Sequence, residues 1–114
     1  MTRKPSPAVL RSKDLDDYLQ GLDQVDKDQA DKQRRWIEEM ESVLKENMFA
    51  GENIRKIQIP PWYIDRYGVN NLYRYEHPEG HRSCYTLTNV EGVGVCPLVI
   101  DLMSHTEYNR RFRY

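Results

Sequence analysis

The spacing of apolar residues changes near Gly51, and this change limits the folds open to the chain. Before it, apolar residues recur every three or four positions, which is typical of helices that bury one face. After it, short runs alternate apolar and polar residues, which is typical of strands. The 114 residues therefore predict one small domain in which a helical hairpin precedes and covers an antiparallel meander.

Two helices are predicted between residues 12 and 49. Ser12 suits the N-cap of the first, and the pattern breaks between residues 21 and 25. Asp26 can then cap the second helix, with Gln29 as its capping-box partner. The apolar stripes are Leu15, Tyr18, Leu19 and Leu22, then Ala30, Ile37, Met40, Leu44 and Met48, widened by Trp36 and Val43. Acidic residues lie off these stripes, so we interpret them as a solvated face rather than a catalytic pair.

Strand-like segments follow the helices. A first short strand alternates at Ile57 and Ile59 and ends at the proline pair that follows, and residues 62–69 are expected to be an aromatic-rich loop. Three further strands are predicted at 72–77, 82–88 and 93–101, with turns at 78–80 and 91–92. Pro97 marks the last as an edge or bulged strand. The tail from Ser104 can form a short helix or lie extended, and both alternatives stay open.

Charge and cysteine content narrow the classes of function. The net charge of −1 gives no overall basic field, so any site for a polyanion must be local. The chain has no secretory h-region near Met1 and no run of roughly 20 apolar residues, so we expect a soluble, cytoplasmic protein. Cys84 and Cys96 lack metal-ligand spacing and are predicted to be buried thiols.

The stretch YEHPEGHRSCYTL, residues 75–87, holds the most unusual chemistry. A turn centred on residues 79–80 would place His77 opposite Arg82, with Tyr73 and Tyr75 on the same face of the sheet. That face would be open, because the helices would cover the other one. Tyrosines stack on bases and a guanidinium matches phosphate, so the face would suit single-stranded RNA.

A purely structural interpretation of the same arginine also stands. Arg82 beside a turn can pair with a carboxylate such as Glu76 or Glu79, which is a commoner role than catalysis. The context of His105 is different, because it follows the apolar run PLVIDLM and precedes Tyr108, Arg110 and Arg111. This order brings an imidazole near cations at the end of a strand.

The order of these segments resembles the RelE/ParE superfamily of type II toxin-antitoxin toxins, and in particular the RelE-like messenger-RNA interferases. The most specific part is the spacing of Gly80, Arg82 and Tyr85, which is similar to the family's G-x-R-x-x-Y hairpin. The resemblance implies an α+β domain over residues 1–114. In it, a helical hairpin at about 12–49 packs on a small curved antiparallel sheet, which occupies about 54–114 together with the tail.

The resemblance further implies a ribosome-dependent endoribonuclease that needs no metal or cofactor. Its 2′-hydroxyl attack on the adjacent phosphate requires a base, an acid and cationic donors. Arg82 matches the arginine that stabilises phosphate. His105 falls where relatives place a catalytic Arg or His, and imidazole suits acid-base work near neutral pH. Tyr108 lies near the C-terminal catalytic tyrosine. The RNA-binding residues implied are Tyr73, Arg74, Tyr75, His77, Arg110 and Arg111.

The partners implied are a cognate antitoxin protein and the ribosome with its messenger RNA, with no role for a membrane. RelE proper carries lysines in the strand before the turn, where this chain has Tyr73 and Tyr75. Two alternatives therefore stay open. One is a homologue that binds protein or RNA without cleaving it, and the other is a ParE-like gyrase inhibitor.

Overall fold

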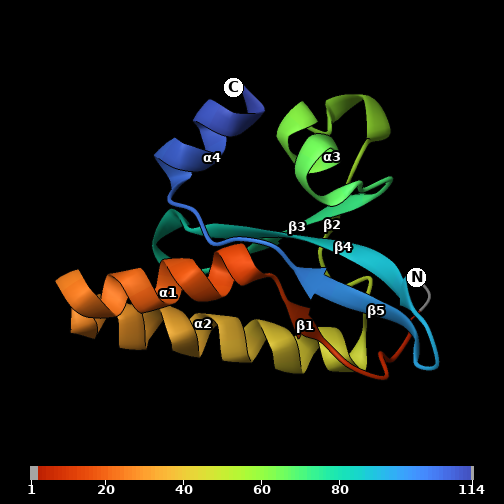
Figure 1. Cartoon of the computed structure of the whole chain (residues 1–114), viewed down its shortest axis with the longest axis horizontal. Coiled ribbons are helices and arrows are strands. Elements are labelled where there is room, and N and C mark those ends of the chain that lie inside the picture. The colour runs from red at the N-terminus through yellow and green to blue at the C-terminus, as the bar shows by residue number, and fades with distance from the viewer. Residues whose placement is uncertain (1–2, 114) are drawn as a thin grey trace.

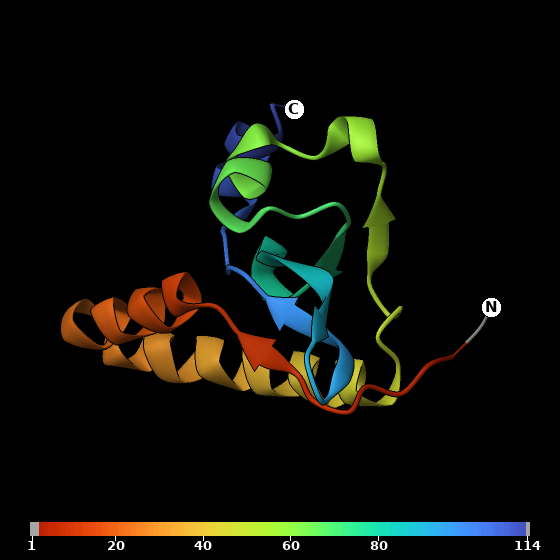
Figure 2. The same cartoon turned by 45° about the vertical axis from the view of Figure 1, so that its right-hand side comes forward.

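The computed structural model describes residues 3–113 and arranges them in three layers (Figures 1 and 2). Helices α1 and α2 form one outer layer, the sheet is the middle layer, and α3 and α4 lie on its other side. The elements in chain order are β1 (Leu10–Arg11), α1 (Lys13–Val25), α2 (Lys27–Glu46), β2 (Glu52–Ile54), η1 (Lys56–Gln58), α3 (Pro61–Tyr67), β3 (Leu72–Glu76), η2 (Pro78–Gly80), β4 (Arg82–Val90), β5 (Gly94–Val99) and α4 (His105–Phe112). The fold is α+β, as expected.

The predicted helical hairpin is confirmed, and its caps follow from the local sequence. The Ser12 hydroxyl accepts a hydrogen bond from the Leu15 N–H at 3.0 Å, and the Asp26 carboxylate accepts one from the Gln29 N–H at 3.1 Å. These bonds satisfy backbone donors that the first turn of each helix leaves open. Helix α1 continues through the predicted break to Val25, so Asp26 alone separates the two helices.

The sheet has the order β1-β5-β4-β3-β2. Its last three strands in the sequence form the predicted antiparallel meander, whereas β1 pairs with β5 in parallel. The sequence prediction lacked β1, because two residues carry no alternation and the strand exists only through its pairing with distant Leu98 and Val99. Within residues 3–113, no helix combines the length and the apolar character that a membrane crossing would demand.

Two segments between Gly51 and Gly68 differ from the prediction. Strand β2 ends before Ile57, which lies in the short η1 turn and is 84% exposed. The expected loop over residues 62–69 is instead helix α3. Its boundaries are set by Pro61 at the first helical position and by Gly68, whose φ of 62° gives a left-handed C-cap.

Both faces of the sheet are covered, so the expectation of an open face is wrong. One core lies between α1, α2 and the sheet, and the other lies between the sheet, α3 and α4. The first core contains Leu15, Leu19, Ile37, Met40, Leu44, Tyr85, Val99 and Leu102. The second contains Ile59, Tyr63, Val69, Leu72, Cys84, Ile100, Met103 and Tyr108. Both cysteines are free and buried, which confirms the prediction for them.

The predicted register of the hairpin between β3 and β4 is wrong by one residue. Glu76, not His77, lies opposite Arg82. The reason is the turn, in which Glu79 and Gly80 both take positive φ values of 61° and 73° and the His77 N–H bonds to the His81 carbonyl. Side chains alternate between the two faces of a strand, so this shift places Arg82 on the opposite face of the sheet from Tyr73, Tyr75 and His77.

Candidate functional site

Arg82 is the first residue of β4, and its backbone is hydrogen-bonded to Met103 in the segment that leads into α4. Its N–H donates to the Met103 carbonyl and its carbonyl accepts from the Met103 N–H, both at 2.8 Å. Its guanidinium lies over the ring of Tyr108, with Cζ 4.8 Å from the ring centroid. Its Nε is 3.6 Å from a Glu76 carboxylate oxygen, but the Glu76 side chain is 65% exposed, so this ion pair faces solvent.

Helix α4 begins at His105, directly beside the hairpin turn. Ser104 and Glu107 form a reciprocal capping box that fixes this helix start. A Cβ placed on Gly80 would lie 3.5 Å from the Cβ of His105, so the turn and the helix start are in contact. The exposed imidazole of His105 is 3.0 Å from the Asn109 amide. Tyr108, one turn later and fully buried, lies below Arg82.

Arg74 on β3 supplies a second guanidinium on the same side of the sheet. Its Nη1 donates to the Tyr108 hydroxyl at 3.5 Å, and its Nη2 donates to Glu52. Its Nε is buried and has no hydrogen-bond partner among residues 3–113. A polar hollow of about 220 Å³ lies beside Arg74 and Glu52. Two cations therefore flank one tyrosine, and each also contacts a glutamate at the molecular surface.

Three predicted RNA-binding residues lie on the opposite side, under α1 and α2. Tyr73 stacks on Tyr85 with ring centroids 5.1 Å apart, and both Tyr73 and Tyr75 pack against the core that those helices cover. His77 is buried, stacks on Trp36 and pairs through Nε2 with the Ser83 hydroxyl at 2.7 Å. Burial, together with the nearby His81, lowers the pKa of His77 to about 4. The structure therefore does not bring these three together with Arg82.

The two arginines predicted from the tail differ in their surroundings. Arg110 is exposed on α4. Arg111 turns toward α3, and its guanidinium is 4.0 Å from the centroid of the Trp62 ring on that helix. Its Nη1 is 3.1 Å from a carboxylate oxygen of Asp101, which follows β5. It is engaged inside the protein rather than presented to a ligand.

Sequence reasoning missed Asp101 and the partners around it. Asp101 is 9% exposed, and burial raises the pKa of its carboxyl to about 6. One signal was available, because a charged residue inside the apolar run PLVIDLM must either reach solvent or find buried partners. Glu52, which pairs with Arg74, gave no comparable signal.

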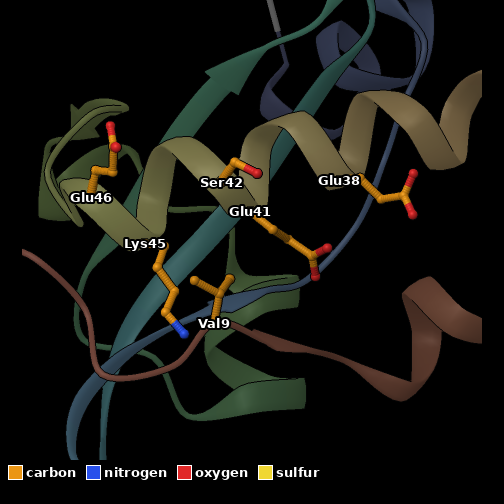
Figure 3. A pocket seen from close by; sticks show the side chains of 6 residues that line it. All are labelled: Val9, Glu38, Glu41, Ser42, Lys45 and Glu46. Atoms are coloured by element: carbon orange, nitrogen blue, oxygen red, sulfur yellow. The ribbon is translucent and has the colours of Figure 1, made fainter.

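A wider hollow of about 620 Å³ lies between the N-terminal segment and α2 (Figure 3). Val9 borders it on one side, and Glu38, Glu41, Ser42, Lys45 and Glu46 border it on the other. Glu41 accepts two hydrogen bonds from Arg11, at 2.8 and 2.9 Å. None of the predicted site residues lines this hollow. In the part of the chain that the structure describes, no three His, Cys, Asp or Glu side chains gather as a metal site would require.

Comparison with known proteins gives no family for the chain. No protein-family model, curated protein or solved structure matches it. What the site can do chemically follows from its residues. The guanidiniums of Arg82 and Arg74 both contact Tyr108, and such cations suit an anion such as a phosphodiester better than a neutral ligand.

Proposed function

We propose that this protein is a RelE-like toxin, a ribosome-dependent endoribonuclease in which Arg82 and His105 act on the scissile phosphodiester. The observation that carries the proposal is the position of the Arg82 guanidinium against α4, the helix that His105 begins. The turn that leads into Arg82 contacts the start of α4 at His105, which supports a role for both residues at one phosphate. The sequence resemblance described above supports the same two residues.

The reaction that this site would perform is an internal transfer at phosphorus. The ribose 2′-oxygen attacks the adjacent phosphorus, so the O2′–P bond forms and the P–O5′ bond breaks. The products are a 2′,3′-cyclic phosphate and a free 5′-hydroxyl. His105 would accept the proton that leaves the 2′-hydroxyl and later release it to water, and a water molecule would supply the proton that the 5′-oxygen takes up. Arg82 would stabilise the negative charge that develops on the phosphate oxygens.

Tyr108 supports Arg82 rather than exchanging a proton with the substrate. Its ring is buried and lies below the guanidinium, where an aromatic face attracts a cation. The ion pair between Arg82 and Glu76 does not prevent phosphate binding, because the Glu76 side chain is exposed and its oxygen is 3.6 Å from Nε, longer than a charge-assisted hydrogen bond. A phosphate can displace Glu76 and form a bidentate contact with the guanidinium instead.

Cleavage on programmed ribosomes tests the proposal. Purified protein is added to ribosomes that hold a defined messenger RNA, and the 5′-hydroxyl fragments are counted. The Arg82→Gln and His105→Ala variants should each lose cleavage by at least about 100-fold, in line with typical losses for such groups. Arg35→Gln, which removes an exposed arginine from α2, is the matched control. Wild-type rates in both site variants would rule the proposal out.

A second candidate is an RNA-binding protein that keeps the site without cleaving. The Arg82 side chain is only 18% exposed, and both guanidiniums already contact glutamates, which favours a binding role with restricted access. This candidate predicts intact transcripts with the wild-type protein, together with salt-dependent RNA binding that Arg82→Gln weakens.

A further inference from the structure

Asp101 lies between the sheet, α3 and α4, and its carboxylate bonds to one group from each. One oxygen accepts from the Cys84 N–H of β4 at 2.8 Å. The other accepts from the Tyr63 hydroxyl of α3 at 2.5 Å and from Arg111 of α4 at 3.1 Å. A carboxylate this deeply buried is tolerated only because these partners satisfy it.

Helix α4 depends on such contacts for its position. It has eight residues, and an isolated helix of that length is unstable in water. The Met103 backbone is bonded to Arg82 just before its first turn, and its last turn is held by Arg111 between Asp101 and the Trp62 ring. Tyr108 lies one turn before Arg111, so a shift of that last turn would also move the ring that supports Arg82.

We propose that Asp101 is a positioning residue, which fixes α4 so that His105 and Tyr108 keep their places relative to Arg82. We call the contacts of Asp101 with Tyr63, Arg111 and Cys84 the clamp. The effect of the clamp on catalysis rests on the proposed function, but the clamp itself is a property of the protein alone. Asp101 bonds to Cys84, Tyr63 and Arg111, and the structure engages all three of these residues inside the protein, so Asp101 has no contact of its own with the proposed RNA site.

The clamp predicts that loss of Asp101 slows the chemical step more than it weakens RNA binding. A displacement of about 1 Å in a catalytic group can cost on the order of 100-fold in rate, whereas the binding surface has several independent contacts. A residue needed only for folding would instead lower the amount of active protein, so bound RNA and cleaved RNA would fall together.

The test uses Asp101→Asn, which keeps the shape and an acceptor for Cys84 but removes the charge that faces Arg111. Glu41→Gln is the matched control, because it removes one carboxylate charge from a bidentate pair with Arg11 on the opposite layer. Single-turnover cleavage on programmed ribosomes gives the rate. Affinity is measured with a messenger RNA that carries a 2′-deoxyribose at the cleavage point. Asp101→Asn should lower the rate by roughly 10- to 100-fold and change affinity by less than about threefold. Glu41→Gln should change neither.

A second readout does not need activity. The chain has two tryptophans, and only Trp62 contacts Arg111, so labelling with 5-fluorotryptophan gives two ¹⁹F signals that Trp62→Phe assigns. Asp101→Asn should move the Trp62 signal and speed amide exchange at Tyr108, and leave the Trp36 signal in place. Arg111→Lys, which keeps the charge but loses the planar fork, should do the same and serves as a check if Asp101→Asn folds poorly.

The outcomes separate the two ideas. If the wild-type protein never cleaves RNA, the proposed function fails, and the Trp62 signal and the Tyr108 exchange rate still decide the clamp. If both of these stay at wild-type values in folded Asp101→Asn, the clamp is overturned. It is equally overturned if cleavage and affinity decline in step, because that result reports only a loss of folded protein.

Discussion

The guanidinium of Arg82 lies 4.8 Å from the centroid of the Tyr108 ring. This contact connects the start of β4, directly after the turn, to helix α4. The Nη1 of Arg74 donates a hydrogen bond to the hydroxyl of the same tyrosine at 3.5 Å. The Tyr108 side chain therefore makes two kinds of contact. Its ring face lies nearest to Arg82, with Arg74 Cζ at 5.8 Å from the same centroid, and its hydroxyl accepts a hydrogen bond from Arg74. Substitutions that keep or remove the ring can separate the contribution of the face from that of the hydroxyl.

Tyr108→Phe and Tyr108→Leu should therefore have different effects. Phenylalanine keeps the aromatic face below Arg82 and loses the hydroxyl that accepts a hydrogen bond from Arg74, so cleavage should fall by no more than about tenfold. Leucine removes the face as well and should lower cleavage much further, with a stability loss of about 1–3 kcal/mol from imperfect packing. Urea unfolding and single-turnover cleavage measure both effects. Equal cleavage rates for the two variants would show that the aromatic face does not support Arg82.

Arg74→Gln should weaken RNA binding and reduce its dependence on salt. If Arg74 contacts one phosphate of a single strand, the slope of log affinity against log salt should become shallower by about 0.7. Affinity for the 2′-deoxy messenger RNA is measured between 50 and 200 mM salt, a range of roughly fourfold that resolves such a change. Arg35→Gln on α2 should leave the slope as it is. An unchanged slope in Arg74→Gln would remove Arg74 from the binding surface.

His77 should make the protein less stable in acid. Its pKa is about 4 in the folded state, against about 6.5 in an unfolded chain, so the unfolded state binds more protons between these values. The stability contributed by neutral His77 is complete above pH 6.5 and is lost as the pH falls to 4. The loss should reach about 3 kcal/mol, at about 1.4 kcal/mol for each pKa unit.

The measurement for His77 compares wild type with His77→Gln at pH 7 and pH 4.5. Asp101 acts in the opposite direction, because its pKa is raised to about 6 and its contribution declines as the pH rises from 4 to 6. That contribution is common to both proteins and cancels in the difference between them. The unfolding free energy of wild type should therefore drop more on acidification than that of the variant. Parallel pH profiles would contradict the assignment.

Gly51→Ala and Gly21→Ala should change stability in opposite directions. A Cβ on Gly51 would lie 2.7 Å from both the Arg74 carbonyl oxygen and the Tyr85 ring, so backbone must shift, at a cost of about 1–3 kcal/mol. A Cβ on Gly21 meets no atom within 4 Å in the described structure, and alanine there should stabilise α1 by about 0.5–1 kcal/mol. Urea unfolding of both variants tests this contrast. A neutral Gly51→Ala would show that the close approach is not required.

The sequence predicts best those parts of the fold that depend on residues close together in the chain. Ser12 and Asp26 were identified as caps because a cap is decided within three or four residues. Helix α3 could have been predicted from Pro61 and Gly68, but the aromatic content of the segment suggested a loop. The hairpin register was missed because the turn places Glu79 in a left-handed conformation that glutamate seldom adopts.

The candidate site was predicted only in part, for a related reason. Resemblance pointed to Arg82, His105 and Tyr108, and the structure puts Arg82 against the helix that carries the other two. The roles of Tyr73, Tyr75 and His77 depended on the mistaken register. The contacts of Arg74 with Tyr108 and of Asp101 with Tyr63 join elements far apart in the chain, and no local pattern encodes them.

The cover that α3 and α4 give to the second face of the sheet also bears on how a nucleic acid could be read. Under the proposed function, RNA could not lie along this covered face and would approach Arg82 and His105 at the end of the sheet where the turn at Gly80 contacts the start of α4. If so, the ribosome proposed to hold the transcript would mainly determine where it is cut, because little of the sheet is left open to read bases.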